Sequence, residues 1–273
     1  MHYRMRRVIP VVLTLLIALC TTALHGATRT DPAVRPLQPQ PAPVKFLAMN
    51  DLHISTAADT PYPSKIIAAM NAEGAATAIV VGDLVNNGKE SEHRIAKGVL
   101  DQFTIPYHIV RGNHDGTDSI AHVYPAANTS SHFVVQGIHF IALDPDPAET
   151  TPWQAKKAVP EALTALRQQL ATIPNDQPII LLCHYPLAND VNYHLANADE
   201  VLSLFAGRKL LAAVGAHYHA NTERWQNGVL LTTTACASSN RGNHDRANSA
   251  KGYRVFEIDA ALHVTTHFTQ VPE

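Results

Sequence analysis

The feature that most constrains this chain is a pattern that occurs five times. An apolar run of four to six residues ends in polar residues that can bind metal or move protons, and runs of this length are typical of buried strands. A packed core histidine would explain one such strand end, but unpaired polar groups beside an apolar core are costly, so the full set indicates a shared site. The five runs are Val44–Met49, Thr77–Val81, Tyr107–Val110, Pro178–Cys183 and Leu210–Val214.

The polar residues that follow these runs form one candidate constellation. Three carboxylate or amide oxygens and four imidazoles make seven ligands, which are too many for one tetrahedral zinc ion. They suffice for two transition-metal ions that share a carboxylate, and a site of that kind suits phosphate ester hydrolysis. In chain order the seven candidate ligands are Asp51, His53, Asp83, Asn113, His184, His217 and His219, and His114 and Asp115 are two further candidate catalytic residues that directly follow Asn113.

Helical spacing separates most of the predicted strands. Alternation of strand and helix predicts right-handed crossovers and a largely parallel sheet, with the site at its carboxyl edge. The predicted helices are Ser64–Ala72, Lys89–Phe103, Glu161–Ile173 and Ala198–Arg208.

The remaining segments have weaker patterns. Residues 116–130 are expected to form a loop, and the connection Asp144–Pro160, which contains Trp153, has the length typical of lids and site walls. Ser131–Gln136 and Ile138–Leu143 alternate like a hairpin. The last three strands are expected to be antiparallel, at Val229–Ala235, Tyr253–Asp259 and Leu262–Phe268.

Residues 1–27 resemble a secretory signal, because a basic start is followed by the apolar run Val8–Leu19, which is short for a bilayer span. An uncleaved membrane anchor is the alternative. Lipidation at Cys20 is not favoured, and the Arg6-Arg7 pair only partly matches a twin-arginine signal. Residues 28–43 are rich in proline and predict an extended linker, so residues 44–273 form the predicted domain of an exported, periplasmic or extracellular protein.

Composition supports one ordinary globular domain. The 273 residues are 46% hydrophobic and carry a formal net charge of -2, so neither nucleic acid nor an anionic membrane surface is favoured as a partner. Cys183 and Cys236 both end apolar runs, which indicates buried thiols and no disulfide framework. No feature of the chain predicts its oligomeric state.

In their order along the chain, the motifs D-x-H, G-D, G-N-H-D, a single H and H-x-H resemble those of the calcineurin-like metallophosphoesterases. The resemblance runs from about Val44 to the end of the chain. It implies an α/β fold with four αββα layers, in which two mixed sheets lie between helices. It also implies a binuclear centre whose ions could be Fe, Mn, Zn or Co.

The resemblance also assigns a role to each residue. Asp51, His53, Asp83 and His219 would hold the first ion, and Asp83 would bridge to a second ion, which is also held by Asn113, His184 and His217. A hydroxide between the ions would be the nucleophile. His114 would stabilise the transition state or protonate the leaving oxygen, and Asp115 would orient His114.

Two positions differ from the usual family pattern. Ala216 stands where the family usually has the glycine before H-x-H, and Asn86 stands where purple acid phosphatases carry a metal-binding tyrosine. The second difference favours the bacterial phosphodiesterase-like branch. We therefore expect an exported hydrolase of small phosphodiesters. A phosphomonoesterase is the alternative, and a catalytically dead scaffold is a weaker one because every ligand is present.

The G-N-H-D motif occurs a second time, at Gly242-Asn243-His244-Asp245, but no apolar run that would form a strand precedes this copy. We interpret this copy as a loop at the rim of the active site, where Arg241, His244 or Arg246 could hold the substrate phosphate, rather than as a metal site. Trp153 and Tyr185 could also line the pocket, although packing is the more common role of such aromatic residues. Eight histidines outside the motifs, His93 among them, are expected to be packed or solvated.

Overall fold

The computed structural model describes residues 43–151, 156–244 and 250–273. The predicted export segment, nearly all of the predicted linker, Trp153, Asp245 and Arg246 lie outside these ranges. All of the described residues belong to one unit, residues 39–273. In the part of the chain that the structure describes, no helix is both long enough and apolar enough to cross a membrane.

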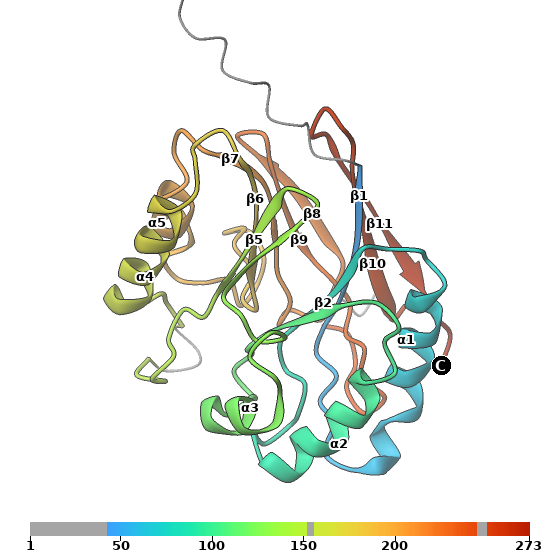
Figure 1. Cartoon of the computed structure of the whole chain (residues 1–273). Helices are drawn as coiled ribbons and strands as arrows, with labels where there is room; N and C mark the ends of the chain where they lie inside the picture. Colours follow the sequence, from blue (N-terminus) through green and yellow to red (C-terminus); the bar gives the residue numbers. More distant parts are fainter. Residues whose placement is uncertain (1–42, 152–155, 245–249) are drawn as a thin grey trace, which may run out of the picture. The chain divides into compact units, whose positions relative to one another are not determined.

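Two β-sheets lie face to face in this unit (Figure 1). The first has the order β11-β10-β1-β2-β3, and the second has the order β4-β5-β6-β7-β9-β8. The first sheet consists of β1 (Val44–Met49), β2 (Thr77–Val81), β3 (Tyr107–Val110), β10 (Gly252–Ile258) and β11 (Val264–Gln270). The second consists of β4 (His132–Val135), β5 (Ile138–Leu143), β6 (Pro178–Cys183), β7 (Lys209–Val214), β8 (Thr222–Gln226) and β9 (Val229–Thr233).

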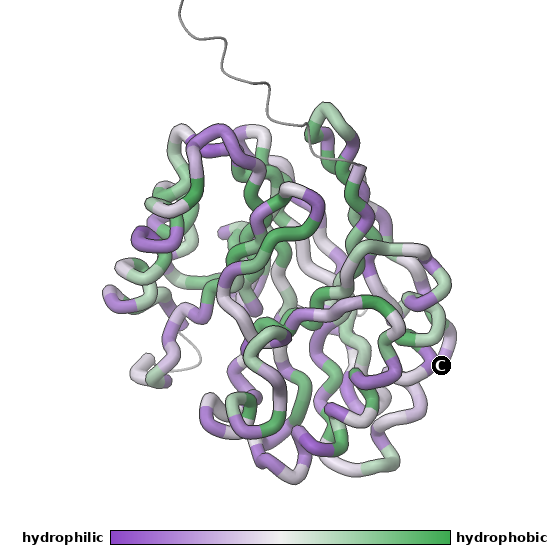
Figure 2. Tube along the Cα trace, viewed as in Figure 1, coloured by the Kyte–Doolittle hydropathy of each residue, from purple (hydrophilic) through white to green (hydrophobic). Residues whose placement is uncertain are grey.

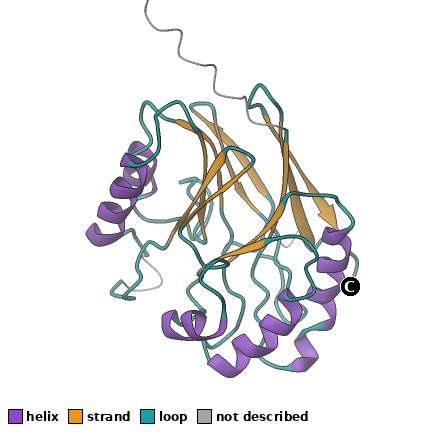
Figure 3. Cartoon of the chain, in the orientation of Figure 1, coloured by secondary structure: helices purple, strands orange, loops and turns teal. Residues whose placement is uncertain are grey.

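Helices cover the outer face of each sheet (Figure 3). The first sheet packs against α1, α2 and α3, and the second packs against α4 and α5. The predicted four-layer αββα sandwich of two mixed sheets is therefore confirmed. The helical segments are η1 (Ala57–Asp59), α1 (Pro61–Asn71), α2 (Glu90–Leu100), α3 (Thr117–Val123), α4 (Pro160–Ala171) and α5 (Ala198–Ser203).

The central strands are mostly apolar because both of their faces are buried. On β1, Leu47 and Met49 face the helices, whereas Phe46 and Ala48 face the other sheet. The Phe46 ring meets the Phe140 ring edge to face across the two sheets, with 5.1 Å between the ring centroids. Figure 2 shows the hydrophobic colour concentrated along these strands and the hydrophilic colour mainly on loops and outer surfaces.

All five predicted ligand-bearing strands are present, but three other predictions were wrong, one of them only in part. The parallel strands are divided between two sheets, whereas the strand pattern predicts one. Residues 116–130, expected to be a loop, contain α3, which buries only Ile120 and so has a weak apolar pattern. The prediction that β9 is antiparallel was wrong only in part: β9 pairs antiparallel with β8, as expected, but runs parallel to β7. The exposed edge strand β8, which comes between β7 and β9 in the sequence, was not recognised.

The predicted helix Ala198–Arg208 is shorter than expected, since α5 ends at Ser203. The connection between β5 and α4 is long, as predicted, and Arg111 holds it in place. The Arg111 guanidinium donates hydrogen bonds to both carboxylate oxygens of Asp144, at 2.6 and 2.9 Å, and to Glu149 at 2.9 Å.

Two glycines allow the loops after β2 and β3 to approach other backbone and ring atoms closely. A Cβ atom at Gly82 would lie 2.4 Å from Nδ1 of His184. A Cβ atom at Gly112 would lie 2.2 Å from Oδ1 of Asp83 and 2.3 Å from its backbone nitrogen. These distances are far inside van der Waals contact, so the G-D and G-N-H-D motifs require their glycines for close approach.

We expect Gly112→Ala to destabilise the protein by about 1–3 kcal/mol, which is the typical cost of overpacking a well-packed site. For a domain of this size that free energy corresponds to a fall in Tm of at least about 2 °C. Gly98→Ala is the matched control, because Gly98 lies in α2 with nothing within 4 Å of its Cβ position. It should be neutral or should stabilise the protein by up to about 1 kcal/mol. A Gly112→Ala protein with wild-type Tm would contradict the close approach.

His93 provides a pH-dependent prediction. Its side chain is fully buried on α2, and in the part of the chain that the structure describes neither ring nitrogen has a hydrogen-bond partner, so burial lowers its pKa to about 4. The unfolded chain binds a proton at this position below about pH 6.5, whereas the folded chain does not until about pH 4. This histidine therefore removes stability as the pH falls through that window, by about 2 kcal/mol between pH 7 and 5.

His93→Leu removes this protonation and keeps a side chain of similar size. We expect the variant to lose about 2 kcal/mol less stability than the wild type between pH 7 and pH 5. Urea unfolding of both proteins at the two pH values measures the difference. Equal losses in the two proteins would show that His93 is not protonated on unfolding.

Candidate metal centre

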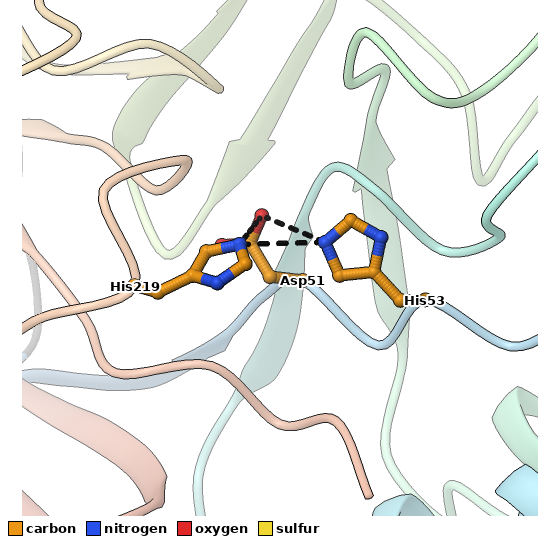
Figure 4. Close-up of side chains that lie close together, drawn as sticks. All are labelled: Asp51, His53 and His219. Carbon is orange, nitrogen blue, oxygen red and sulfur yellow. Dashed lines mark hydrogen bonds and ion pairs between the residues drawn. The ribbon is translucent and has the colours of Figure 1, made fainter. Parts of the chain in front are cut away.

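The carboxyl ends of β1, β2, β3, β6 and β7 bring all seven predicted metal ligands into one region. Figure 4 shows three of them, Asp51, His53 and His219, which come from the loops after β1 and β7. Nε2 of His219 lies 3.2 Å from Oδ1 of Asp51 and 3.3 Å from Nε2 of His53. Residues 166 positions apart in the sequence are therefore neighbours at this site.

Asp83 connects this group to a second one. Its Oδ2 lies 3.3 Å from Nε2 of His184 and 3.7 Å from Nε2 of His53. Three groups of three side chains each have ligand atoms close enough to share an ion, within 4.8 Å of one another. Asp51, His53 and His219 form one, and Asp83, His184 and His217 form another. The third, which consists of His53, Asp83 and His114, shares a residue with each of the other two. The geometry therefore has the two-centred form predicted from the motifs.

The chemistry of the donors fits bound metal ions. Three buried ligand atoms lack a hydrogen-bond partner in the described structure: Oδ1 of Asp51, Oδ1 of Asn113 and Nε2 of His184. Leaving buried polar atoms unpaired is costly, and coordination of a cation would satisfy all three. Two transition-metal ions are therefore the group that these residues suit best.

Backbone carbonyls orient two of the histidines. Nδ1 of His184 donates a hydrogen bond to the carbonyl of Val81 at 2.8 Å, and Nδ1 of His219 donates to that of Gly242 at 3.3 Å. Each bond fixes the ring and leaves Nε2 facing the carboxylates, which is the usual arrangement around metal-binding histidines. The bond from His184 also joins the second sheet to the first.

Backbone strain is concentrated at the same residues. Five of the seven predicted ligands have a positive φ, which non-glycine residues rarely adopt and which costs roughly 1–3 kcal/mol at each position. The surrounding structure must hold each of them in place. These residues are Asp51 (55°), His53 (49°), Asp83 (52°), His217 (62°) and His219 (49°).

The electrostatic environment keeps the carboxylates ionised. Burial alone would raise the pKa of Asp51, but the neighbouring His219 and His184 outweigh it and lower that pKa to about 2. The pKa of Asp83 is likewise lowered, because His184 and His53 outweigh the effect of its burial. Burial lowers the pKa of His53 to about 4 and that of His217 to about 3, so both rings are neutral near pH 7. The carboxylates of Asp83 and Asp51 outweigh burial at His184 and raise its pKa to about 9, and Asp51 likewise raises the pKa of His219. Binding of metal ions would displace the protons from these two rings. Ionised carboxylates and neutral imidazoles are the forms that bind metal ions.

His114 lies on the wall of the pocket beside this cluster. Its backbone N–H donates to Oδ1 of Asp83 at 2.9 Å, and its Nδ1 lies 2.7 Å from the carbonyl oxygen of Asn86. That carbonyl fixes the ring and leaves Nε2 available to the pocket, about a third of the side chain being exposed.

The prediction that Asp115 orients His114 was wrong. The Asp115 carboxylate is fully buried and accepts hydrogen bonds from the backbone N–H groups of Leu84 (2.9 Å), Val85 (3.2 Å) and Gly112 (3.0 Å). Its role is to join the loops after β2 and β3. Burial, followed by the charge of Asp83, raises the pKa of Asp115 to about 7.

The centre opens into a pocket of about 510 Å³. The second G-N-H-D lies at its rim, as the sequence predicts: Arg241 and His244 line the pocket, and the His244 N–H donates to the carbonyl of His219 at 3.2 Å. Tyr193 also lines it but was not identified from the sequence, because no motif surrounds this loop residue. Tyr185 is buried and faces a different pocket, beside Arg111.

Comparison with known proteins agrees with this geometry. A family model described as calcineurin-like phosphoesterase matches residues 44–221. A probable glycerophosphodiester phosphodiesterase from Arcobacter nitrofigilis is 24% identical over 193 residues, which cover 66% of this chain and 69% of that protein. A probable cyclic nucleotide phosphodiesterase from Rhodopseudomonas palustris is 27% identical over 158 residues, which cover 52% of this chain and 57% of that protein.

The fold also resembles a solved structure, that of a dimetal phosphatase from Danio rerio. The TM-score is 0.61 at 12% sequence identity, and the match covers 82% of this chain and 98% of that one. The family match spans well over half of the 273 residues. The chain therefore belongs to the calcineurin-like phosphoesterase family and is a metal-dependent phosphoester hydrolase.

Proposed function

We propose that this chain hydrolyses phosphodiesters at a dinuclear metal centre and that His114 assists departure of the leaving group. The observation that carries this proposal is the convergence of two Asp/His clusters on one open pocket, with His114 on its wall. The names of the two relatives, both phosphodiesterases, support the choice of substrate class.

Each cluster would hold one metal ion. Asp51, His53 and His219 would bind the first, Asn113, His184 and His217 the second, and the Asp83 carboxylate would be shared between them. Two metal ions held in this way would supply a nucleophilic hydroxide near neutral pH, and their positive charge would stabilise the transition state.

His114 is placed to donate a proton. The Asn86 carbonyl holds its Nδ1, and the hydrogen bond from its N–H to Asp83 fixes its backbone relative to the cluster. A protonated ring in this position can donate from Nε2 to the oxygen that leaves the phosphorus atom, which spares that oxygen a full negative charge.

The pocket lining favours diesters over monoesters. Among the described residues that line it, Arg241 is the only one with a permanent positive charge. A phosphodiester carries one negative charge and a monoester carries close to two near neutral pH, so a single guanidinium suits the diester better.

A catalytically dead scaffold is the least supported alternative. Such a protein has no need to preserve ligands or to maintain a strained backbone at them. Here all seven ligands are present, and five of them have a positive φ. Export remains a proposal that rests on the N-terminal pattern of basic and apolar residues alone.

The substrate class can be tested by comparing p-nitrophenyl phosphate with bis(p-nitrophenyl) phosphate on one metal-analysed preparation. We expect a higher kcat/KM for the diester. Asp83→Asn should remove the shared carboxylate charge, lower the metal content and reduce turnover by at least about 100-fold. Asp176→Asn, at an exposed position, is the matched control. A faster monoester reaction would support the phosphomonoesterase instead.

His114→Ala should lower kcat by about 10²–10⁴ while the bound metal stays unchanged, since the ring is proposed to donate a proton and not to bind an ion. The loss should be larger for alkyl diesters than for p-nitrophenyl esters, because nitrophenolate leaves readily without a proton. The exposed His263 provides the control variant His263→Ala. Equal losses on both kinds of ester would rule out proton donation by His114.

A further inference from the structure

One side of the metal pocket is an aromatic surface formed by Tyr193 and His244, which we call the aromatic wall. Both residues line the pocket, and their ring centroids are 5.3 Å apart. Tyr218 packs behind them, with 6.1 Å between its centroid and that of His244 and only 5° between the ring planes. Neither residue of the wall is needed to hold a metal ion in the proposed centre.

The wall lies directly beside the metal ligands. The Tyr193 ring is 5.8 Å from that of His217, and the His244 ring is 5.1 Å from that of His219. Tyr218 stands between these two ligands in the sequence, so the backbone that positions the ligands also positions the ring behind the wall. A group attached to a phosphate at the centre would therefore come within reach of the wall.

Tyr193 is held in an exposed position by its loop. Its side chain is 48% exposed, although tyrosine rings of this kind usually pack. Its φ of 61° is unfavourable for a residue with a large side chain. Val191 and Leu195, two residues before and two residues after Tyr193 in the sequence, have buried side chains that anchor the loop. The Leu195 N–H also donates a hydrogen bond to the carbonyl of Pro186 at 2.9 Å.

This combination is typical of a binding surface rather than of a packing contact. An exposed ring in a strained backbone contributes little to stability, but a preorganised ring binds a planar partner with little loss of entropy. Stacking of a ring on an aromatic side chain strengthens binding by roughly 5- to 150-fold. Flexible glycerol or ethanolamine groups have no planar face to stack.

Arg241 lies on the rim of the same pocket. Its guanidinium donates a hydrogen bond to the side-chain oxygen of Asn86. The backbone carbonyl of the same Asn86 accepts the hydrogen bond that orients the His114 ring. The pocket therefore has a cation near the proposed acid and a flat aromatic surface beside His217 and His219. A phosphodiester that carries one planar ring matches both features.

We propose that the aromatic wall of Tyr193 and His244 selects phosphodiesters with a planar aromatic substituent, either a nucleobase or an aryl group, over diesters with aliphatic substituents only. This inference rests on the proposed phosphodiesterase function and names the substrate class of the same site.

The test uses the full-length, metal-loaded protein and three diesters. Thymidine 5′-(methyl phosphate) carries a nucleobase and no aryl group, phenyl methyl phosphate carries an aryl group and no nucleobase, and glycerophosphoethanolamine carries no ring. The measured quantity is the ratio of kcat/KM between the wild type and Tyr193→Ala for each diester, so differences in intrinsic reactivity cancel. Tm and metal content of each variant are recorded alongside.

We expect Tyr193→Ala to reduce kcat/KM for the ring-bearing diesters at least about fivefold more than for glycerophosphoethanolamine, mainly through KM. Tyr193→Phe should restore most of the loss, because stacking needs the ring and not the hydroxyl group. Trp225→Ala is the matched control, since Trp225 is 62% exposed on β8 and does not line the pocket. This variant should match the wild type on all three diesters.

The outcomes separate the two proposals. Equal losses on all three diesters, or no loss on any, would overturn selection by the wall while the phosphodiesterase function stands. A wild type that hydrolyses none of the diesters would overturn both. A loss confined to the thymidine ester would identify the planar group as a nucleobase, and a loss confined to the phenyl ester would identify it as an aryl group.

Discussion

The site depends on the burial of one carboxylate, that of Asp83, where the two sheets meet. An unpaired buried carboxylate is very costly, so its neighbours must supply opposite charge and hydrogen bonds. Oδ1 accepts the His114 N–H, Oδ2 faces His184 and His53, and the Asp83 carbonyl accepts the His53 N–H at 3.0 Å. Loops from three strands of the first sheet and one of the second are therefore placed relative to this residue.

This dependence explains why the backbone is strained where chemistry is expected. The strands end in line with the sheets, but the ligands must turn inward within two or three residues, and a positive φ at Asp51, Asp83 and His217 achieves that turn. The cost is tolerated because the ligands, the close approach of Gly112 to Asp83 and the Asp115 hydrogen bonds hold the loops from several directions. Metal ions bound at this site would compensate the same strain.

Strand ends could be predicted from the sequence, whereas contacts between loops could not. Every ligand-bearing strand follows from an apolar run whose last residue adjoins a motif, and carboxyl edges gather such residues together. The partner of His114 could not be predicted in this way. The family resemblance assigned this role to Asp115, but its carboxylate turns back to three backbone N–H groups, and the carbonyl of Asn86, 28 residues before His114, takes its place. Tyr193 has no motif at all, since only the loop's path brings it to the pocket.

The two copies of G-N-H-D show how context assigns a role to the same residues. Gly112 follows a strand and has Asp83 where its Cβ would be, so the residues after it are held against the carboxylates. Among the described residues, no atom lies within 4 Å of the Cβ position of Gly242, and the Gly242 carbonyl instead accepts a hydrogen bond from the ring of His219. The first histidine therefore lies beside Asp83, whereas the His244 ring packs against that of His219, with 5.1 Å between the ring centroids. In the proposed mechanism the first histidine would meet the reacting phosphate and His244 would meet the group that the phosphate carries. The second copy of the motif would then contribute to substrate selection rather than to the reaction.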